Sequence, residues 1–181
     1  AAHDLRTPLA TIFGFSRTLG RDATLNDTQR NYVGMIETAT AQLDELLSEL
    51  SLLSRIEAGR YRPSLVEADS LELTRYAEEQ LTPERVHLSG TGATVRVDRE
   101  PVKKAVSALI QATLRHGARE EVWVVVDGPL ITTSPVTKHA EPVLAGREIR
   151  ALSAASARRL IEFLGGSVIV EGENLVIRLP Q

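Results

Sequence analysis

The most constraining feature of this sequence is a seven-residue hydrophobic repeat between residues 26 and 59. Its apolar positions are separated alternately by four and three residues, a spacing that places a continuous seam along one side of a bundled helix. Asn26 or Asp27 can accept hydrogen bonds from the first free amides, and Gly59 can adopt the left-handed conformation that ends a helix. The spacing therefore predicts a helix of about 30 residues. The seam consists of Tyr32, Ile36, Ala39, Leu43, Leu46, Leu50 and Leu53.

A shorter amphipathic helix with the same spacing is predicted upstream, and residues 20–22 then interrupt it. Two such helices joined by a short loop form a helical hairpin. One hairpin has only two helices with which to bury a long leucine seam, so we predict a homodimer whose hairpins form a four-helix bundle. The alternative is that the seam packs against the chain's own second half. The upstream repeat consists of Leu5, Leu9, Ile12, Ser16 and Leu19.

The second half has a mixed pattern that predicts an α+β sandwich, with one mixed sheet and helices on one face. Helices are expected from Asp69 or Ser70 to Leu81, from a cap at Asp98 to His116, and from about residue 153 to 164. Strands are expected around a turn at residues 90–92 and before a loop of about twenty residues. The predicted domains are a helical hairpin at 1–62 and the sandwich at 63–181. The predicted strands are residues 86–88, 95–97, 122–126, 167–171 and 174–179.

Composition narrows the function classes. The chain has 181 residues, 43% of them apolar and 25% charged, which is typical of a globular protein. Its net charge of −3 leaves no electrostatic footprint for nucleic acid or an anionic membrane. It has no cysteine, which excludes disulfides, thiolate metal sites and a cysteine nucleophile. No apolar run is long enough to span a bilayer, so we expect no membrane contact by this chain. Because the sequence starts at Ala1, we also expect it to be a fragment of a longer protein.

The stretch from His3 to Leu9 carries residue types that suit phosphoryl chemistry. His3 and Thr7 lie one helical turn apart, so they share a face. A solvent-facing imidazole accepts a phosphoryl group well, because one neutral nitrogen has a free lone pair near pH 7. Asp4 could hold the other nitrogen or take a proton, and Thr7 could position a water. On residue chemistry alone, a surface histidine ahead of a helix bent by Pro8 is the alternative.

The sequence His3-Asp4-Leu5-Arg6-Thr7-Pro8-Leu9 resembles the H-box of the sensor histidine kinases of two-component systems. Residues 46–59 resemble the end of that family's second dimerisation helix, and the resemblance covers residues 1–62. It implies that His3 is the phospho-acceptor, that Asp4 is its acid/base partner, and that Thr7 serves in dephosphorylating a response regulator.

The second half is similar in layout to the ATP-binding domain of these kinases, but three nucleotide motifs differ. Ala112 stands where the family has a Mg²⁺-binding Asn, with Gln111 beside it, and Ala108 stands where another Asn is common; alanine offers no oxygen ligand. Asp127 and Gly128 resemble part of the Asp-x-Gly-x-Gly adenine motif without its second glycine. Residues 151–154 read Ala-Leu-Ser-Ala where the family has Gly-Leu-Gly-Leu, which removes the close backbone approach to phosphate.

Three functions remain open. The first is a cytoplasmic histidine phosphotransferase that exchanges a phosphoryl group between His3 and the Asp of a response-regulator receiver domain, with ATP binding lost. The second is an active sensor histidine kinase whose ATP-binding site is divergent. Only this second function requires ATP and Mg²⁺ as cofactors, with Gln111 and Asp127 as substitute ligands. The third is a non-enzymatic dimeric pseudokinase scaffold.

The first function predicts a docking surface for the receiver on the His3 side of the first helix. The other histidines have no metal-ligand spacing, and Arg115 beside His116 could contact phosphate only if a nucleotide binds. The docking surface would comprise Arg6, Ala10, Phe13 and Arg17. The histidines without metal-ligand spacing are His87, His116 and His139.

Overall fold

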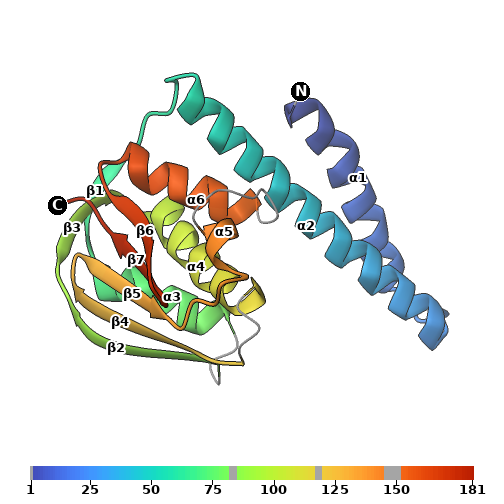
Figure 1. Ribbon diagram of the computed structural model, residues 1–181. Helices are drawn as coiled ribbons and strands as arrows, with labels where there is room; N and C mark the ends of the chain where they lie inside the picture. The colour runs from blue at the N-terminus through green and yellow to red at the C-terminus, as the bar shows by residue number, and fades with distance from the viewer. Residues whose placement is uncertain (1, 82–84, 117–119, 145–151) are drawn as a thin grey trace. The chain divides into compact units, whose positions relative to one another are not determined.

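The computed structural model describes residues 2–81, 85–116, 120–144 and 152–181, with side chains from residue 5 onward. The chain forms two compact units, Ala1–Ser54 and Arg55–Gln181 (Figure 1). The sequence-based division fell later, between residues 62 and 63. The units divide within the second helix because its last turn belongs to the α/β unit, where Ile56 is buried and Glu57 pairs with Arg159.

The first unit is a helical hairpin of α1 (Ala2–Gly20) and α2 (Asp27–Glu57). Asn26 begins α2 with a reciprocal cap: the Gln29 amide donates to its Oδ1 at 2.9 Å, and its own amide donates to Gln29 Oε1 at 3.0 Å. After α2, Gly59 has a φ of 62°, the conformation expected of a residue that ends a helix. Both predicted helices are therefore present, with their predicted start and end signals.

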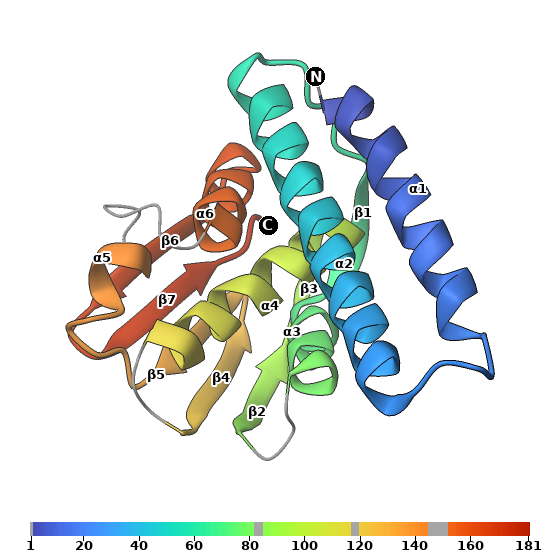
Figure 2. The ribbon, with the colours of Figure 1, turned by 90° about the vertical axis from the view of Figure 1, so that its right-hand side faces the viewer.

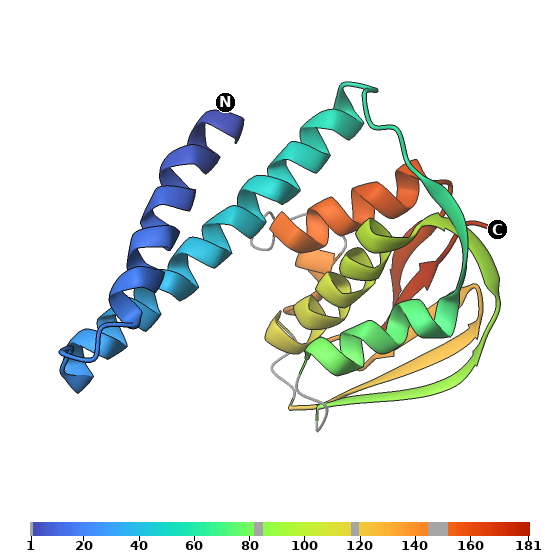
Figure 3. The same ribbon diagram turned by 180° about the vertical axis from the view of Figure 1, so that it is seen from behind.

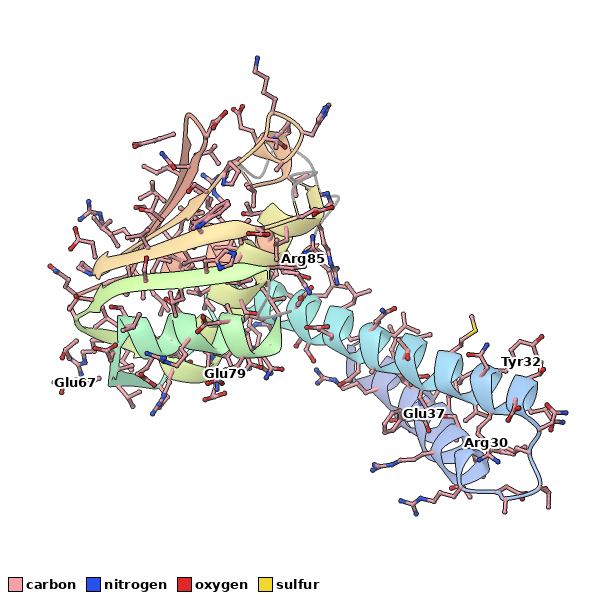
Figure 4. All side chains as sticks on the ribbon, turned by 90° about the horizontal axis from the view of Figure 1, so that it is seen from below. Arg30, Tyr32, Glu37, Glu67, Glu79 and Arg85 are labelled. Atoms are coloured by element: carbon pink, nitrogen blue, oxygen red, sulfur yellow. The ribbon has the colours of Figure 1, made fainter. Side chains whose placement is uncertain are left out.

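The two helices of the hairpin bury few large side chains against each other. The buried positions are Leu9 and Ser16 on α1 and Val33 and Thr40 on α2. A polar contact adds to them, since the Arg6 guanidinium donates to Ser48 Oγ at 2.8 Å. The predicted seam lies beside this contact line and is largely exposed in the single chain. Its exposed members are Leu5, Ile12 and Leu19 of α1 and Tyr32, Ile36, Leu43, Leu46 and Leu50 of α2; Figure 4 labels Tyr32 near the start of α2.

The second unit contains a mixed five-stranded sheet, in the order β2-β4-β5-β7-β6, and a two-stranded sheet of β1 and β3. In the larger sheet β2 runs parallel to β4, and every other pairing is antiparallel. The strands are β1 (Leu65–Asp69), β2 (Val86–Gly92), β3 (Thr94–Asp98), β4 (Val122–Gly128), β5 (Leu130–Ser134), β6 (Ser167–Glu171) and β7 (Asn174–Arg178). The helices are α3 (Ser70–Gln80), α4 (Arg99–His116), α5 (Glu141–Leu144) and α6 (Leu152–Phe163).

Helices α3, α4 and α6 cover one face of the five-stranded sheet (Figures 2 and 3). Strand β4 shows the consequence: Val122, Val124 and Val126 are buried, whereas Trp123 and Val125 are about half exposed. The prediction that residues 122–126 form an internal strand is confirmed by the strand order. Its second face, however, is open to solvent, as is usual for a sheet covered on one side only.

Two strands and one turn were predicted incorrectly. Strand β1 was not predicted, because its acidic residues hide a short edge strand. Strand β5 lies in the segment predicted as a long loop, between two prolines that indicate turns. The predicted turn at residues 90–92 belongs to β2, where Gly90 has a φ of 110° and an added Cβ would collide with the Val126 carbonyl. Glycine is therefore needed here for a close approach between β2 and β4.

Candidate functional site

The predicted phosphotransfer residues lie at the start of α1. The backbone of His3 and Asp4 is helical, and their side chains lie outside the described residues. Thr7 is exposed one turn further along. The helix continues through Pro8, which cannot donate a hydrogen bond to the Asp4 carbonyl. The structure thus places the three predicted residues on one continuous helix, while their chemical roles stay predictions.

The predicted receiver-docking residues of α1 are all exposed. Leu9 and Ser16 are buried, so they lie outside the exposed docking set. Arg6 is exposed but also contacts α2, because its guanidinium donates to Ser48 Oγ and its Nε lies 3.5 Å from Asp44 Oδ1. Phe13 is only partly exposed, with 37% of its surface accessible to solvent. The exposed set is Arg6, Thr7, Ala10, Phe13 and Arg17.

Helix α4 carries the positions that resemble the magnesium-binding motif. Ala112 is buried, and Gln111 and Ala108 are half-buried. Ala112 has no side-chain oxygen, so this position cannot supply a ligand to a hard cation such as Mg²⁺. Among the residues that the structure describes, no group of three or more His, Cys, Asp or Glu side chains is arranged to hold a metal ion.

Asp127 does not lie near these positions. Helix α4 ends at His116 and the chain then enters β4 at Val122, so the end of α4 and the start of β4 lie at the same end of the sheet. Asp127 is at the opposite end of β4, where it pairs with Leu130 across the turn to β5. The interpretation of Asp127 as a substitute adenine or metal ligand beside Gln111 is therefore not supported by the topology.

Two threonine hydroxyls lie on β5 and the segment after it, and β5 ends at the end of the sheet where α4 stops. Thr133 is fully buried near the end of β5, and Thr137 is half-buried shortly after it. Neither Oγ1 atom has a hydrogen-bond partner within the described part of the chain. Sequence reasoning missed both residues because it treated this segment as a loop. They are neutral hydroxyls and carry no charge with which to bind a cation.

The start of α6 corresponds to the expected glycine-rich phosphate segment. Residue 151 lies outside the described residues, Leu152 and Ser153 are half-buried, and Ala154 is buried. Helix α6 already begins at Leu152. At Ser153, the described one of the two positions where the resemblance calls for glycine, a side chain therefore replaces bare backbone.

The remaining histidines do not converge on a site. His87 lies on the open face of the sheet, where its Nε2 is 2.8 Å from Glu121 Oε2 and its ring centroid is 5.4 Å from that of Trp123. His139 is exposed and His116 is half-buried at the end of α4. That these residues form no zinc site stays a prediction.

Comparisons with known proteins connect this arrangement to a family. Residues 1–59 match the His Kinase A (phospho-acceptor) domain. Over 123 residues the chain is 32% identical to the methanogenesis regulatory histidine kinase FilI of Methanothrix harundinacea, a match that covers 64% of this chain and 14% of FilI. Over 217 residues it is 25% identical to the histidine protein kinase DivJ of Caulobacter vibrioides, covering 99% of this chain and 36% of DivJ. The chain thus spans well under half the length of these relatives.

Solved structures share the fold. Full-length ShkA in complex with AMPPNP has a TM-score of 0.72 at 20% identity, over 97% of this chain and 43% of ShkA. The Acinetobacter baumannii histidine kinase AdeS has a TM-score of 0.60 at 15% identity, over 97% of this chain and 94% of that structure. At these identities the similarity concerns the fold alone.

A phospho-acceptor hairpin followed by this α/β sandwich defines a histidine kinase-like protein of two-component signal transduction. The chain is thus similar to sensor histidine kinases, through the phospho-acceptor domain over residues 1–59 and, in the case of DivJ, over nearly its whole length. None of the helices in the described ranges is both long and apolar enough to cross a membrane.

Proposed function

We propose that this chain is a histidine phosphotransferase that exchanges a phosphoryl group with the aspartate of a response-regulator receiver domain. An imidazole nitrogen of His3 attacks the phosphorus of the receiver's aspartyl phosphate. A nitrogen–phosphorus bond forms while the bond between phosphorus and the aspartate oxygen breaks, and the aspartate leaves as a carboxylate. The reverse transfer follows the same path. The proposal places the chain in the cytoplasm with its receiver partner.

The observation that carries this proposal is the match of residues 1–59 to a phospho-acceptor domain. His3 lies on a helix whose neighbouring outward residues, from Arg6 to Arg17, are exposed in the structure. A partner can therefore approach along α1 without displacing the buried contacts of the hairpin. Phosphoryl exchange needs a positioned imidazole and the receiver's own Mg²⁺, so it does not depend on a nucleotide site in this chain.

The loss of ATP binding is the second part of the proposal. Ala112 supplies no oxygen, Asp127 lies at the far end of β4, and the half-buried Ser153 stands where glycine would be needed. Each change removes a different contribution: a metal ligand, a polar contact to adenine, and a close backbone approach to phosphate. Because all three are absent together, we expect no productive handling of Mg-ATP.

A homodimer is the third part. The exposed leucines and isoleucines of α1 and α2 form a long apolar surface beside the helix–helix contact of the hairpin. Exposed apolar surface of this extent on a soluble unit marks an interaction site. A second copy of the hairpin covers it with the same heptad spacing, which supports the four-helix bundle predicted from the sequence.

The test is transfer of labelled phosphate from receiver domains charged with radiolabelled acetyl phosphate. We expect acid-labile label to appear on the wild-type chain and to be absent from His3→Gln. His87→Gln is a matched control, because His87 lies on the sheet and should leave labelling unchanged. Labelling that persists in His3→Gln, or that disappears only in His87→Gln, would contradict the assignment of His3.

An active kinase with a divergent site is the competing function, and the half-buried Gln111 on α4 is the observation that favours it. Calorimetric titration of Mg-ATP into the full chain separates the two. Our proposal predicts no heat of binding up to millimolar ATP. Micromolar binding, together with labelling from radioactive ATP that Gln111→Ala abolishes, would establish the kinase instead. Full signalling by His3→Gln would establish a non-enzymatic scaffold.

A further inference from the structure

The segment that follows α2 is held against the α/β unit by a buried tyrosine. Only 3% of the surface of Tyr61 is exposed, although it stands between two arginines in the sequence. Its hydroxyl donates a hydrogen bond to Asp98 Oδ2 at 2.6 Å. The backbone amide of Ser64 donates to the same oxygen at 3.2 Å. One carboxylate, at the start of α4, therefore holds both the phenol and the backbone of the connector.

The ring of Tyr61 is enclosed by side chains from two helices. The ring of Phe163, at the end of α6, meets it edge-on at a centroid distance of 5.7 Å. The guanidinium of Arg55 lies 5.2 Å from the ring centroid. One turn along, Glu57 Oε1 accepts a hydrogen bond from Arg159 Nε at 2.6 Å.

The backbone of the connector is also ordered by its own hydrogen bonds. The amides of Arg60 and Tyr61 both donate to the Arg55 carbonyl, at 2.8 and 3.0 Å, and the Gly59 amide donates to the Ile56 carbonyl at 2.9 Å. These bonds satisfy the carbonyls that the end of a helix leaves free. The path from Arg55 to Ser64 is thus fixed by backbone and side-chain contacts together.

From this geometry we infer that the Tyr61 anchor, comprising Tyr61, Asp98, Phe163, Glu57 and Arg159, makes the end of α2 and the connector a rigid part of the α/β unit. A change in orientation between the two units is then absorbed inside α2, in the turn that ends at Ser54, and not in residues 60–64. Moving the connector would break a hydrogen bond to a carboxylate and expose a buried ring, which costs more than bending a helix. Ser51 and Ser54 make bending easier in this turn of α2, because serine is a weaker helix former than alanine or leucine.

Hydrogen exchange of the connector amides tests the anchor. In the wild-type chain we expect the hydrogen-bonded amides of Gly59, Arg60, Tyr61 and Ser64 to be protected. We expect Tyr61→Phe to accelerate their exchange about tenfold or more, because a hydrogen bond to a carboxylate is lost. Tyr76→Phe is the matched control, since Tyr76 lies on α3 with Lys103 Nζ 4.5 Å from its ring centroid. Unchanged exchange in Tyr61→Phe, or unprotected amides in the wild type, would overturn the anchor.

Spin-label distances locate the bend. Cysteines replace Ala41 on α2 and Glu171 on β6, since the chain has no cysteine of its own, and the labelled chain is diluted with an excess of unlabelled chain. Glycine is then introduced at Ser54 or at Ser64, which are both exposed. We expect Ser54→Gly to broaden the distance distribution about twofold and Ser64→Gly to leave it at the wild-type width. Broadening by Ser64→Gly that equals or exceeds that of Ser54→Gly, or an unchanged width in both variants, would overturn the inference.

Discussion

Replacing Leu43 by aspartate tests whether the exposed seam of the hairpin is a dimer interface. Leu43 has 51% of its surface exposed in the single chain. Full burial of a leucine contributes about 1.5–3 kcal/mol, so covering the exposed half contributes about 1 kcal/mol per chain and about 2 kcal/mol per symmetric dimer. Loss of this contribution alone weakens dimerisation about 30-fold. An ionised carboxylate in the seam adds a desolvation cost, so the measured effect should be larger.

Sedimentation velocity across a concentration series measures the effect, and circular dichroism confirms that the helices remain. Gln42→Asp is the matched control, because it adds the same charge to α2 on an exposed side outside the seam. Leu43→Ala should give an intermediate effect, since it shortens the side chain without adding charge. If Leu43→Asp stays folded and dimerises as tightly as wild type, the seam is not the interface and the reasoning from exposed leucines fails.

Three further predictions use other parts of the chain. Thr7→Ala should retain labelling of His3 but slow the loss of phosphate from a charged receiver, measured by gel autoradiography over time; an unchanged decay would remove Thr7 from that role. Leu109→Ala should lower the free energy of unfolding by about 2–5 kcal/mol in urea, because the fully buried side chain leaves a cavity. Burial, followed by the hydrogen bond to Asp98, raises the pKa of Tyr61 well above the usual value of about 10. Its contribution to stability is therefore complete below about pH 10 and is lost as the pH rises further, so an alkaline absorbance titration should contain a late tyrosinate component that Tyr61→Phe lacks.

The helical hairpin was predictable because long helices follow a local rule. The seven-residue repeat, the cap at Asn26 and the terminal Gly59 are each readable within a few residues of sequence, and the structure has all three. The fold of the second half was predictable as a class. Its strands β1 and β5 were missed because short edge and hairpin strands depend on partners far along the chain, which local spacing does not reveal.

In the candidate site too, local features were predictable from the sequence, whereas features that depend on distant parts of the chain were not. The stretch from His3 to Leu9 is contiguous on one helix, so the sequence was sufficient to assemble it. Asp127 required knowledge of β5, because only the pairing of β4 with β5 shows at which end of the sheet that carboxylate lies. The Tyr61 anchor was missed for a related reason: Tyr61 and Asp98 are far apart in the chain, and a tyrosine between two arginines looks like a solvated connector.

The open face of the sheet equips the protein with an internal fluorescent reporter. Trp123 is the only tryptophan of the sequence, and it lies on β4 of the α/β unit, half exposed and next to the His87 ring. Its emission should therefore be red-shifted and accessible to acrylamide in the native state. Dissociation of the hairpins should leave this signal constant, whereas melting of the sheet should change it. Emission and sedimentation recorded on one sample would thus separate dissociation of the proposed dimer from loss of the α/β fold, with no added label.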